Sequence, residues 1–538
     1  MASKTHVVLT GSKRGKDPTA VRVRNVDPKE KIVVTIGLRG PDLPGPDDYI
    51  GQTMTPKELA KKFSARNEDA DKVAKVLKTF GHRVEEVSLV TRSMRVSGTA
   101  EAMEAAFKPD WAIVRSPRQG RYRGRQGLIH IPKELEGIVT GVFGLDQRRM
   151  AHRKSRAASS AGRGTARSPL TPACIEEHYN FPSGDGGGQS IAIAEFGGGY
   201  FKEDMKKYCN QFHRSVPNVQ RIPVGAPAYT LQQILDLQDP QLRFIELESS
   251  FEVMMDVELI GGLCPNADIS VYFSTTGQDG WVNLLNKVIA ETIATEVVPV
   301  ALSISCGWAE DDQDQWSLNG LDHINERLKQ LSRLGITTCV ASGDGGSGYG
   351  IDDSHAHVDF PSSSPYVMGV GGTMLTKSGE EVTWNDSDGA TGGGVSTVYP
   401  RPDWQDVHVA SVNLTHLDGR VVPDVSALAG EPYYDLVFLG FRWPQAGTSA
   451  SAPVWAALIA RINANLPQDK PRRFLTPLLY TNSIQNLPVG QAPFRHITTG
   501  NNISTPPGIG YYAGPGFNAA TGWGVPDGKK LLKCLRMI

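Results

Sequence analysis

The sequence predicts an α/β protein in which a doubly wound, mostly parallel sheet flanked by helices follows a smaller α+β domain. From about residue 173 onward, strongly apolar runs alternate with helical patterns, which is typical of βαβ units. Before that point, short strands and helices are joined by short links over about 30–146. The chain has 538 residues, too many for one ordinary hydrophobic core, so at least two domains are expected.

Composition excludes two broad classes of protein. The hydrophobic fraction is 40%, close to that of globular proteins, so the chain is not disordered throughout. No run approaches the roughly 20 apolar residues that span a bilayer, so we expect no membrane-spanning segment. The first residues, MASKTHVVLTGSKRGKD, also lack the apolar stretch of an ordinary signal peptide.

The N-terminal domain is expected to cover residues 1–146. Its first 30 residues are polar and basic, which predicts a mobile arm. Strands are predicted from β-branched residues at 31–40, 82–90 and 93–98. Helices are predicted at 55–63, 68–81, 99–107 and 131–146, the last with a proline at its start.

Residues 147–172 differ in composition from both of their neighbours. They are rich in Arg, Lys, Ser, Ala and Gly, and they contain no acidic residue. They also show no periodic apolar face. This segment is therefore predicted to be an exposed, protease-sensitive linker to a second domain over 173–538.

The second domain is predicted to contain a helix-covered parallel sheet. Its strands are apolar on both faces, which is typical of sheets buried between helices. Strands are predicted at 189–199, 267–275, 297–308 and 336–344, and helices at 201–212, 246–263, 281–294, 319–335 and 454–466. Sites in such sheets gather at the carboxyl ends of strands, where this chain has polar or glycine-rich segments at 195–199, 305–307 and 342–346.

The formal net charge of −1 averages over two unlike parts. Residues 1–168 contain 33 Lys or Arg and 18 Asp or Glu, for a charge of +15, so the rest of the chain carries −16. This asymmetry could indicate an arm that binds nucleic acid. It could equally indicate two parts of one molecule that attract each other. Composition does not decide between them.

The six cysteines are scattered along the chain without a C-x-x-C pair. This spacing counts against a zinc ribbon or a small disulfide scaffold, and it favours buried, reduced thiols over isolated disulfides. The cysteines are Cys174, Cys209, Cys264, Cys306, Cys339 and Cys534.

The motif GTSASAP, Gly447 to Pro453, directly precedes an amphipathic helical pattern. Ser449 therefore lies at or just before a helix N-terminus. Free backbone N–H groups and the helix dipole there stabilise negative charge on a reacting oxygen, which suits a nucleophile. A lone serine before a helix is more often only an N-cap. The motif also differs from the G-x-S-x-G elbow of α/β-hydrolases.

A nucleophilic serine needs a base, and no histidine lies in a convincing motif. His355 and His357 fall in a polar loop that we expect to be a solvated turn. Glu252 and Asp256 are the alternative, since they lie one turn apart on a predicted helix with apolar neighbours. Two close carboxylates share a proton, which suits a general base positioned by a second acid. A solvated acidic face is the other interpretation, and spacing favours neither.

Asp344 follows a buried strand and precedes two glycines. A carboxylate at such a position most often accepts hydrogen bonds from turn amides. In an apolar cleft the same group can instead stay protonated and donate a hydrogen bond to an oxyanion.

Together these motifs resemble the sedolisin (serine-carboxyl) peptidases, and most closely their kumamolisin-like members. The family combines a subtilisin-like fold with a Ser–Glu–Asp triad, and the resemblance covers nearly the whole chain, including an activation prodomain. GTSASAP matches the nucleophile motif, E-V-M-M-D the E-x-x-x-D helix, and ASGDGG the strand end with the oxyanion-hole aspartate. IAIAEFGGGY matches the first strand of the catalytic domain.

The resemblance implies a role for each matched residue. Ser449 would be the nucleophile, with Glu252 as general base and Asp256 as its partner. Asp344 would stabilise the oxyanion, and Glu195 would be an outer member of the carboxylate network. A glutamate can accept a proton in acid where a histidine base is lost, and low pH keeps an aspartic acid protonated. The resemblance therefore implies a self-processing zymogen of an endopeptidase active at acidic pH.

It also implies partners and a location. The partners would be protein or peptide substrates and the chain's own prodomain as an intramolecular inhibitor, with maturation cleavage within 147–172. We expect a monomer outside the cell, with neither nucleic acid nor membrane as partner. Cys306 stands where the family usually has Trp, and Trp308 follows two residues later, so no subsite preference is carried over.

The family's calcium site near the C-terminus uses two aspartates and three backbone carbonyls. The matching stretches here are FRHIT and AGPGFN, so His496 and Asn518 replace both aspartates. Calcium prefers anionic oxygen, so we predict weak or no calcium binding. The positions that still offer oxygens are Ile497, Gly514, Gly516 and Asn518.

Two other function classes are weighed against a peptidase. A catalytically silent member could act as a binding protein, although all four matched catalytic residues are present. The basic N-terminal part could bind nucleic acid, but it contains no motif that recognises DNA or RNA, and its excess charge lies largely in the linker and arm.

Overall fold

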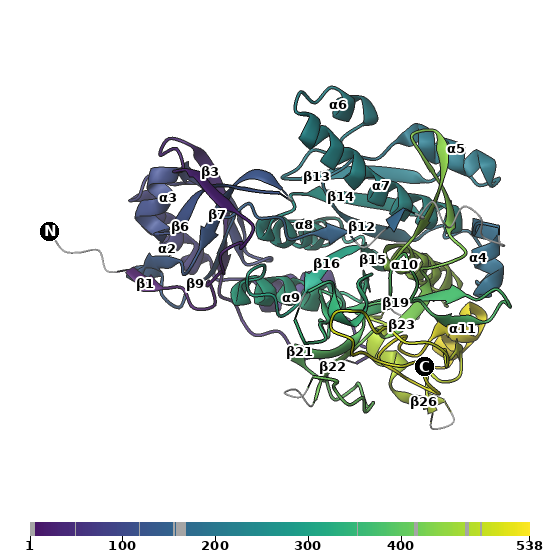
Figure 1. The fold of residues 1–538 in the computed structure, drawn as a ribbon. Helices are drawn as coiled ribbons and strands as arrows, with labels where there is room; N and C mark the ends of the chain where they lie inside the picture. The colour runs from purple at the N-terminus through teal and green to yellow at the C-terminus, as the bar shows by residue number, and fades with distance from the viewer. Residues whose placement is uncertain are drawn as a thin grey trace.

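The structure is a computed structural model of the whole chain. It describes residues 6–48, 50–117, 119–153, 156–157, 168–351, 353–413, 418–467, 473–484 and 487–538. A smaller N-terminal domain lies beside a larger domain that contains a helix-covered sheet (Figure 1). This arrangement confirms the fold class expected from the sequence.

The N-terminal domain is built on a four-stranded antiparallel sheet in the order β4-β5-β3-β9. Val34 of β3, Leu77 of α2 and Met103 of α3 are fully buried in one core, so these helices pack on this sheet. A second sheet has the order β2-β6-β7. The elements are β1 (His6–Val8), β2 (Val21–Arg24), β3 (Lys31–Leu38), α1 (Pro56–Phe63), α2 (Asn67–Lys78), β4 (Arg83–Ser88), β5 (Ser93–Thr99), α3 (Ala100–Phe107), β6 (Asp110–Ser116), β7 (Gly120–Gln126), β8 (His130–Pro132), the 3-10 turn η1 (Lys133–Leu135) and β9 (Val139–Phe143).

Two predictions for this domain are wrong. Residues 6–30 are not a mobile arm, because β1 pairs with β8, β2 pairs with β6, and Leu9 and Val26 are buried in the core. Their polar composition arises because β2 exposes all of its side chains. Residues 131–146 are not a helix either. Gly137 has a φ of +71°, which interrupts a helix, and the β-branched residues that follow form β9.

The linker prediction is also wrong for its first residues. Arg148, Met150 and Ala151 are buried, and two short strands follow them, β10 (His152–Arg153) and β11 (Arg156–Ala157). The rest of the predicted linker up to residue 167 lies outside the described residues.

The larger domain contains, within the described residues, an eight-stranded sheet in the order β13-β14-β12-β15-β17-β19-β20, with β23 also paired to β19. All of these pairings are parallel except that of β19 with β20. The sheet strands are β12 (Ser190–Phe196), β13 (Asn218–Val224), β14 (Asp268–Ser274), β15 (Ala301–Ile304), β17 (Thr337–Ala341), β19 (Met368–Leu375), β20 (Glu381–Thr383) and β23 (Val425–Leu428).

Helices cover both faces of this sheet. Alternate residues of β12 belong to different cores, Ile191 and Ile193 with α7 and α10, and Ala192 and Ala194 with α8 and α9. Strands buried on both faces explain the continuous apolar runs in the sequence. The helices are α4 (Pro172–His178), α5 (Lys202–Gln211), α6 (Leu231–Leu235), α7 (Pro240–Leu263), α8 (Gln278–Thr295), α9 (Leu318–Arg333), α10 (Thr448–Asn465) and α11 (Gly528–Met537).

α7 ends at Leu263, where the predicted helix over 246–263 also ends, and Gly261 and Gly262 lie in its last turn. A Cβ at Gly261 would meet Met205 Cε at 2.4 Å, and one at Gly262 would meet the Tyr208 ring at 2.9 Å. These glycines therefore allow α5 to approach α7 closely. Outside the sheet lie β16 (Cys306–Ala309), η3 (Gly346–Gly348), β18 (Asp359–Phe360), β21 (Gly394–Pro400), β22 (Gly419–Val422), β24 (Tyr434–Phe438), β25 (Phe441–Ala446), η4 (Thr476–Leu479), β26 (Asn482–Ile484), β27 (Leu487–Pro488), β28 (Phe494–Arg495) and β29 (Val525–Pro526).

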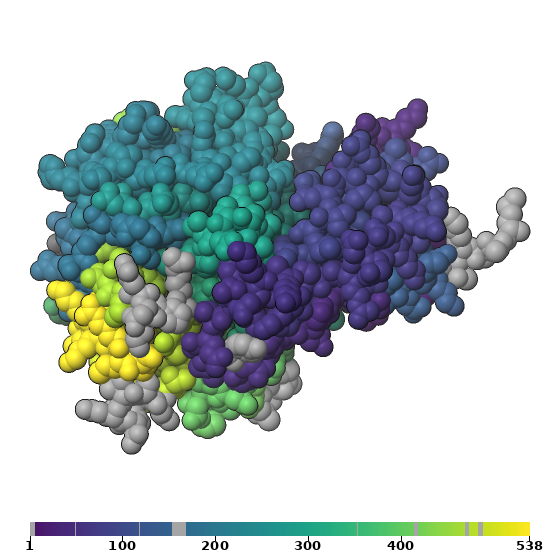
Figure 2. Space-filling view, turned by 180° about the vertical axis from the view of Figure 1, so that it is seen from behind, coloured from purple at the N-terminus to yellow at the C-terminus, as the bar shows by residue number. Residues whose placement is uncertain are grey.

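The N-terminal domain packs against α8 and α9 of the larger domain. Thr35 Oγ1 donates a 2.7 Å hydrogen bond to Asn283 Oδ1 on α8, and Arg327 of α9 donates to the carbonyl oxygen of Thr91 at 2.6 Å. In the space-filling view the purple domain sits directly against teal and green surfaces of the larger one (Figure 2). The two domains therefore share an extensive interface.

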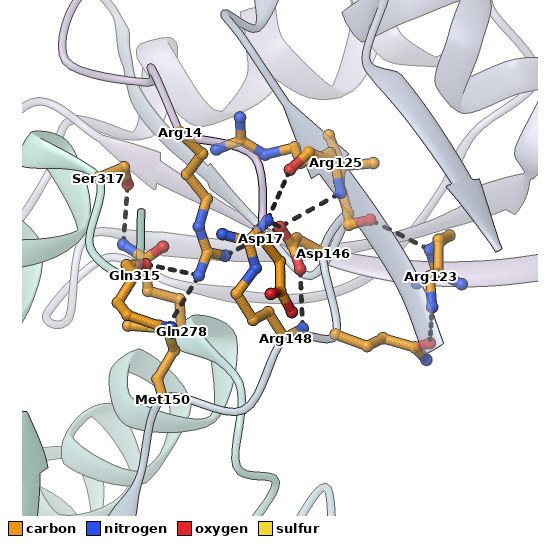
Figure 3. Close-up of polar contacts among 12 residues, drawn as sticks. Arg14, Asp17, Arg123, Arg125, Asp146, Arg148, Met150, Gln278, Gln315 and Ser317 are labelled. Carbon is orange, nitrogen blue, oxygen red and sulfur yellow. Dashed lines mark hydrogen bonds and ion pairs between the residues drawn. The ribbon is translucent and has the colours of Figure 1, made fainter. Parts of the chain in front are cut away.

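A buried charge cluster lies at one side of this interface (Figure 3). Arg14 is only 2% exposed, its Nη1 lies 3.2 Å from Asp146 Oδ2, and its Nη2 donates to the carbonyl oxygen of Gln315 at 2.6 Å. Arg148 also pairs with Asp146 and donates to the carbonyl oxygen of Asp314. Burial lowers the pKa of Arg14 to about 10, so it stays charged at neutral and acidic pH. Part of the positive charge of the N-terminal part is thus buried against the larger domain.

All six cysteines are free thiols; five are buried as expected, whereas Cys174 is exposed. Among the described residues, no helix is long and apolar enough to cross a bilayer.

Candidate active site

Ser449 is the second residue of α10. Gly447 precedes this helix with a φ of +126°, a conformation that L side chains rarely adopt, and it turns the chain from β25 into α10. The Ser449 side chain is buried, and its Oγ donates a 3.1 Å hydrogen bond to the carbonyl oxygen of Ser305. Ser449 therefore lies in the first turn of a helix, as a nucleophile stabilised by helix N–H groups requires.

Glu252 and Asp256 lie one turn apart on α7, and both are essentially unexposed, at 1% and 0%. Glu248, one turn before them, is exposed. The structure thus excludes the interpretation of this pair as part of a solvated acidic face.

The pKa of Asp256 is raised well above its usual value, chiefly by burial and then by the neighbouring carboxylate of Glu252. Ser305 Oγ lies 2.9 Å from Oδ1 and 3.0 Å from Oδ2 of Asp256, and Ser303 Oγ lies 3.3 Å from Oδ2. These hydrogen bonds favour the ionised form but do not overcome burial. Two carboxyl groups in one dry site share a proton, so this pair can hold one and accept another.

Ser305 joins the carboxylate pair to the nucleophile. Its hydroxyl also lies 3.2 Å from the carbonyl oxygen of Ser449, while its own carbonyl accepts the Ser449 hydroxyl. The sequence predicts a polar strand end at Ser305 but gives no sign of this link. The link depends on how α7 and α10 pack over β15, which no local pattern encodes.

Asp344 lies at the carboxyl end of β17, beside Ser449 in space. Its Oδ1 accepts hydrogen bonds from the backbone N–H of Thr448 at 2.8 Å and from the Thr448 hydroxyl at 2.7 Å. Thr448 directly precedes Ser449, so the carboxyl group is held against the start of α10. The side chain is 7% exposed, which makes it the most accessible of the four matched residues.

Glu195 is a buried residue near the end of β12, in register with Phe273 of β14. One of the two histidines expected in a solvated turn differs from that expectation. His357 is only 6% exposed and lies between Asp311 and Asp353, so it is not part of a solvated turn, whereas His355 is exposed. Within the described residues the Ser449 hydroxyl bonds to Ser305 and to no histidine.

Strands β10 and β11 flank the nucleophile on two sides. Arg153 pairs in antiparallel register with Cys306, the residue after Ser305. Arg156 pairs in antiparallel register with Ala446, three residues before Ser449. The His152 ring lies 4.2 Å from the Trp308 ring, measured between centroids. Strands β10 and β11 thus lie in extended form on two sides of Ser449.

The calcium-site positions expected from the sequence lie in loops near the C-terminus. Asn518 is buried, and its Nδ2 lies 3.3 Å from the carbonyl oxygen of Ile497 and 3.4 Å from that of Gly514. His496 packs near the Trp523 ring at 6.3 Å between centroids. Gly516 has a φ of +77° in the same loop. Within the described residues no cluster of His, Cys, Asp or Glu could hold a metal ion.

Two sequence families match the chain. The family described as "Pro-kumamolisin, activation domain" matches residues 18–148, and the subtilase family matches residues 248–524. Kumamolisin from Bacillus sp. (strain MN-32) is 33% identical over 98% of this chain and 96% of its own. A tripeptidyl-peptidase from Aspergillus fumigatus is 25% identical over 98% of this chain and 97% of its own.

A solved peptidase structure is among those that match the chain. It is a Pseudomonas sedolisin, described as a serine-carboxyl proteinase, solved in complex with pseudo-iodotyrostatin. It is 25% identical, with a TM-score of 0.56, over 69% of this chain and 99% of its own. The uncovered part of this chain is about the size of the N-terminal domain and the linker.

Proposed function

The chain belongs to the sedolisin (serine-carboxyl) peptidases of the kumamolisin type, serine-type peptidases made as zymogens, and we propose that it is an acid-active endopeptidase with Ser449 as nucleophile. The observation that carries this proposal is the hydrogen-bonded link from Ser449 through Ser305 to the buried Asp256. Glu252 and Asp256 supply carboxyl groups where a histidine base is missing.

In the proposed mechanism Ser449 attacks the peptide carbonyl while Glu252 takes its proton. Asp256 lies one turn away on α7 and holds the proton that the pair shares, so Glu252 is the member that ionises and acts as base. The resulting acyl-enzyme is then hydrolysed by water, with the same carboxyl group returning and accepting protons.

Asp344 is proposed to donate a hydrogen bond to the oxyanion from its protonated carboxyl group. Its Oδ1 is engaged by Thr448, which orients the group beside the nucleophile. A carboxyl group donates only when protonated, so this role needs acid. The N–H groups at the start of α10 add to the same stabilisation.

The N-terminal domain is proposed to be an activation prodomain that inhibits the enzyme until the chain cuts itself. We assign residues 1–146 to the prodomain, 147–172 to the linker and 173–538 to the catalytic domain. Strands β10 and β11 pair with the chain on both sides of Ser449. An extended peptide substrate binds a protease in the same way, because backbone hydrogen bonds can hold any sequence in register. The linker would therefore block the cleft as a tethered substrate.

The same registers narrow the expected cleavage site. Arg153 and Arg156 are held on opposite sides of the nucleophile, and the three residue steps between them span at most about 10 Å. One of the peptide bonds between Arg153 and Arg156 is therefore proposed as the first to be cut. The enzyme would act on protein or peptide substrates, as a monomer outside the cell.

The test compares purified wild type with Ser449→Ala at about pH 4 and pH 7, followed on a gel and by N-terminal sequencing. Wild type should shorten at acidic pH and gain a new N-terminus between residues 154 and 156, while the variant stays full length. Ser451→Ala is the matched control, because Ser451 lies on the same helix but donates to Ala427 and Leu428. If Ser449→Ala matures by itself as fast as wild type, self-processing by Ser449 is wrong.

The outcome also separates a peptidase from a silent binding protein. A silent member would remain full length in both forms and would cleave no added peptide at either pH. The expected cleavage by wild type alone supports the catalytic assignment.

A further inference from the structure

The side chain of Asn518 is clamped between two loops near the C-terminus. Its Oδ1 accepts hydrogen bonds from the backbone N–H of Thr521 at 2.9 Å, the backbone N–H of Ala520 at 3.1 Å and the Thr521 hydroxyl at 3.1 Å. Two backbone donors can only face an oxygen, so these contacts fix which end of the amide is which. The Nδ2 group therefore points the opposite way.

On that opposite side Nδ2 faces two backbone carbonyls from different loops. It lies 3.3 Å from the oxygen of Ile497 and 3.4 Å from the oxygen of Gly514. The amide has two N–H groups, so it can serve both acceptors. The positive end of a neutral amide thus occupies the point on which these carbonyl oxygens converge.

These residues do not fit calcium. Calcium binds six to eight oxygens and prefers carboxylates, whereas Asn518 presents N–H groups toward the carbonyls and His496 supplies no oxygen. Turning the amide to offer its oxygen would leave two buried backbone N–H groups, those of Ala520 and Thr521, facing an NH₂ group. That arrangement is unfavourable, because both buried N–H groups would lose their acceptor.

The clamped loop supports the strand beside the nucleophile helix. Thr521, which bonds Asn518, also accepts a hydrogen bond from Ser426 Oγ of β23 at 3.0 Å. Ser451 of α10 in turn donates to the carbonyls of Ala427 and Leu428 on the same strand. Hydrogen bonds therefore connect this loop, through β23, to the helix that carries Ser449.

We propose that the Asn518 side-chain amide takes the place of a cation at this loop junction, and that the protein keeps its C-terminal loops closed without calcium. An amide does not titrate, so this clamp holds as pH falls through the range in which carboxylate ligands become protonated. The inference concerns stability and does not depend on the proposed catalytic roles.

The test measures thermal unfolding in the uncut Ser449→Ala chain with excess calcium or excess chelator. The parent should unfold at the same temperature in both conditions and should bind no calcium in equilibrium dialysis. His496→Asp combined with Asn518→Asp should unfold several degrees lower in chelator and regain that loss in calcium. In that variant a calcium ion, bound by the two new carboxylates and the carbonyls of Ile497 and Gly514, would replace the Asn518 amide.

Asn502→Asp is the matched control. Asn502 is also fully buried and also bridges backbone groups, donating to Gly393 at 3.1 Å and accepting from Tyr511 at 2.8 Å. This variant should lose stability without any response to calcium. A calcium-dependent unfolding temperature in the parent would overturn the proposal even if the double variant fails to fold. So would a double variant that is as stable in chelator as in calcium.

Discussion

Ser305 Oγ lies 2.9 Å from Oδ1 and 3.0 Å from Oδ2 of Asp256, so one hydroxyl bridges both oxygens of a buried carboxyl group. A hydroxyl that donates to a carboxylate favours the ionised form. Burial and Glu252 raise the pKa of Asp256, and Ser305 moderates that rise. Ser305 thus sets how readily the pair gives up its last proton.

Ser305→Ala should shift the pH profile of the matured enzyme. Without the hydroxyl the pKa of Asp256 rises further. In the Asp344→Asn background, where residue 344 no longer titrates, the alkaline limb of kcat/KM should therefore move to higher pH. We also expect kcat to fall by about tenfold or more, because the backbone carbonyl of Ser449 loses the Ser305 hydroxyl that lies 3.2 Å from it. Ser303→Ala is the control for the loss of kcat, since Ser303 also bonds Asp256 at 3.3 Å but shows no hydrogen bond to Ser449. An unmoved alkaline limb when Ser305→Ala is added to Asp344→Asn would contradict this role.

Asp344 variants test the proposed proton dependence of the oxyanion site. Asp344→Ala should lower kcat about 100- to 1,000-fold at every pH, the usual cost of one oxyanion donor. Asp344→Asn keeps an N–H donor that does not titrate, so its remaining activity should extend to higher pH than that of wild type. Initial rates on a fluorogenic peptide across the pH range measure both effects. Equal profiles for the two variants would argue against donation by Asp344.

Asp146→Asn should weaken the docking of the N-terminal domain. Burial alone would raise the pKa of Asp146, but Arg14, Arg148 and Arg125 outweigh it and hold the pKa below its usual value. The stabilisation is therefore present above the ordinary aspartate pKa and is lost as pH falls through the lowered one. Asp17, Tyr122 and Asp279 also face this cluster.

In the Ser449→Ala background, Asp146→Asn should cost about 3–5 kcal/mol near neutral pH, as expected for an arginine left buried without its partner. The difference from the parent should shrink in strong acid. Asp69→Asn, whose partner Arg39 is 48% exposed, is the control and should cost far less. Denaturant unfolding at several pH values measures both. A constant difference at all pH values would refute the linkage.

Glu310 should make the folded chain more stable in mild acid. Burial raises the pKa of Glu310 to about 7, against hydrogen bonds from Ser396 and the Thr397 N–H. The folded state therefore holds a proton that the unfolded state releases. This contribution is complete below pH 4.5 and is lost as pH rises through 7, a change of about 3 kcal/mol at most.

Glu310→Gln is neutral at every pH, so its unfolding free energy should change less than that of the parent between about pH 4.5 and 7. Glu296→Gln is the control, because it makes the same change at a side chain that is 54% exposed. Denaturant unfolding in the Ser449→Ala background gives both curves. Parallel curves for Glu310→Gln and the parent would show that Glu310 titrates normally.

The sequence predicted the parallel sheet well because its strands are apolar on both faces and alternate with amphipathic helices. It failed at 131–146, where a proline suggested the start of a helix but Val139–Phe143 pairs with β3 in the sheet. It failed again at residues 6–30, because edge strands with exposed side chains show no apolar pattern. Both failures concern segments whose structure is set by distant partners.

In the candidate site, too, local motifs could be predicted from the sequence, whereas contacts between distant segments could not. Ser449, Glu252, Asp256 and Asp344 could be singled out by motif, and the structure brings Asp344 to Thr448 and Asp256 to Ser305. The bridging role of Ser305 could not be predicted, because it follows from the packing of two helices over one strand end. The catalytic roles of the four motif residues stay predictions, which the variants above test.

The contact between Arg14 and the carbonyl oxygen of Gln315 joins residues 301 positions apart. A ribosome adds about 5–20 residues per second, so Arg14 leaves it roughly 15–60 s before its acceptor is made. During that interval the N-terminal domain can complete its own core while its docking face has nothing to dock on. The order of synthesis thus favours an N-terminal domain that folds before the larger domain is complete, so the proposed inhibitor would already be folded when each new catalytic domain forms.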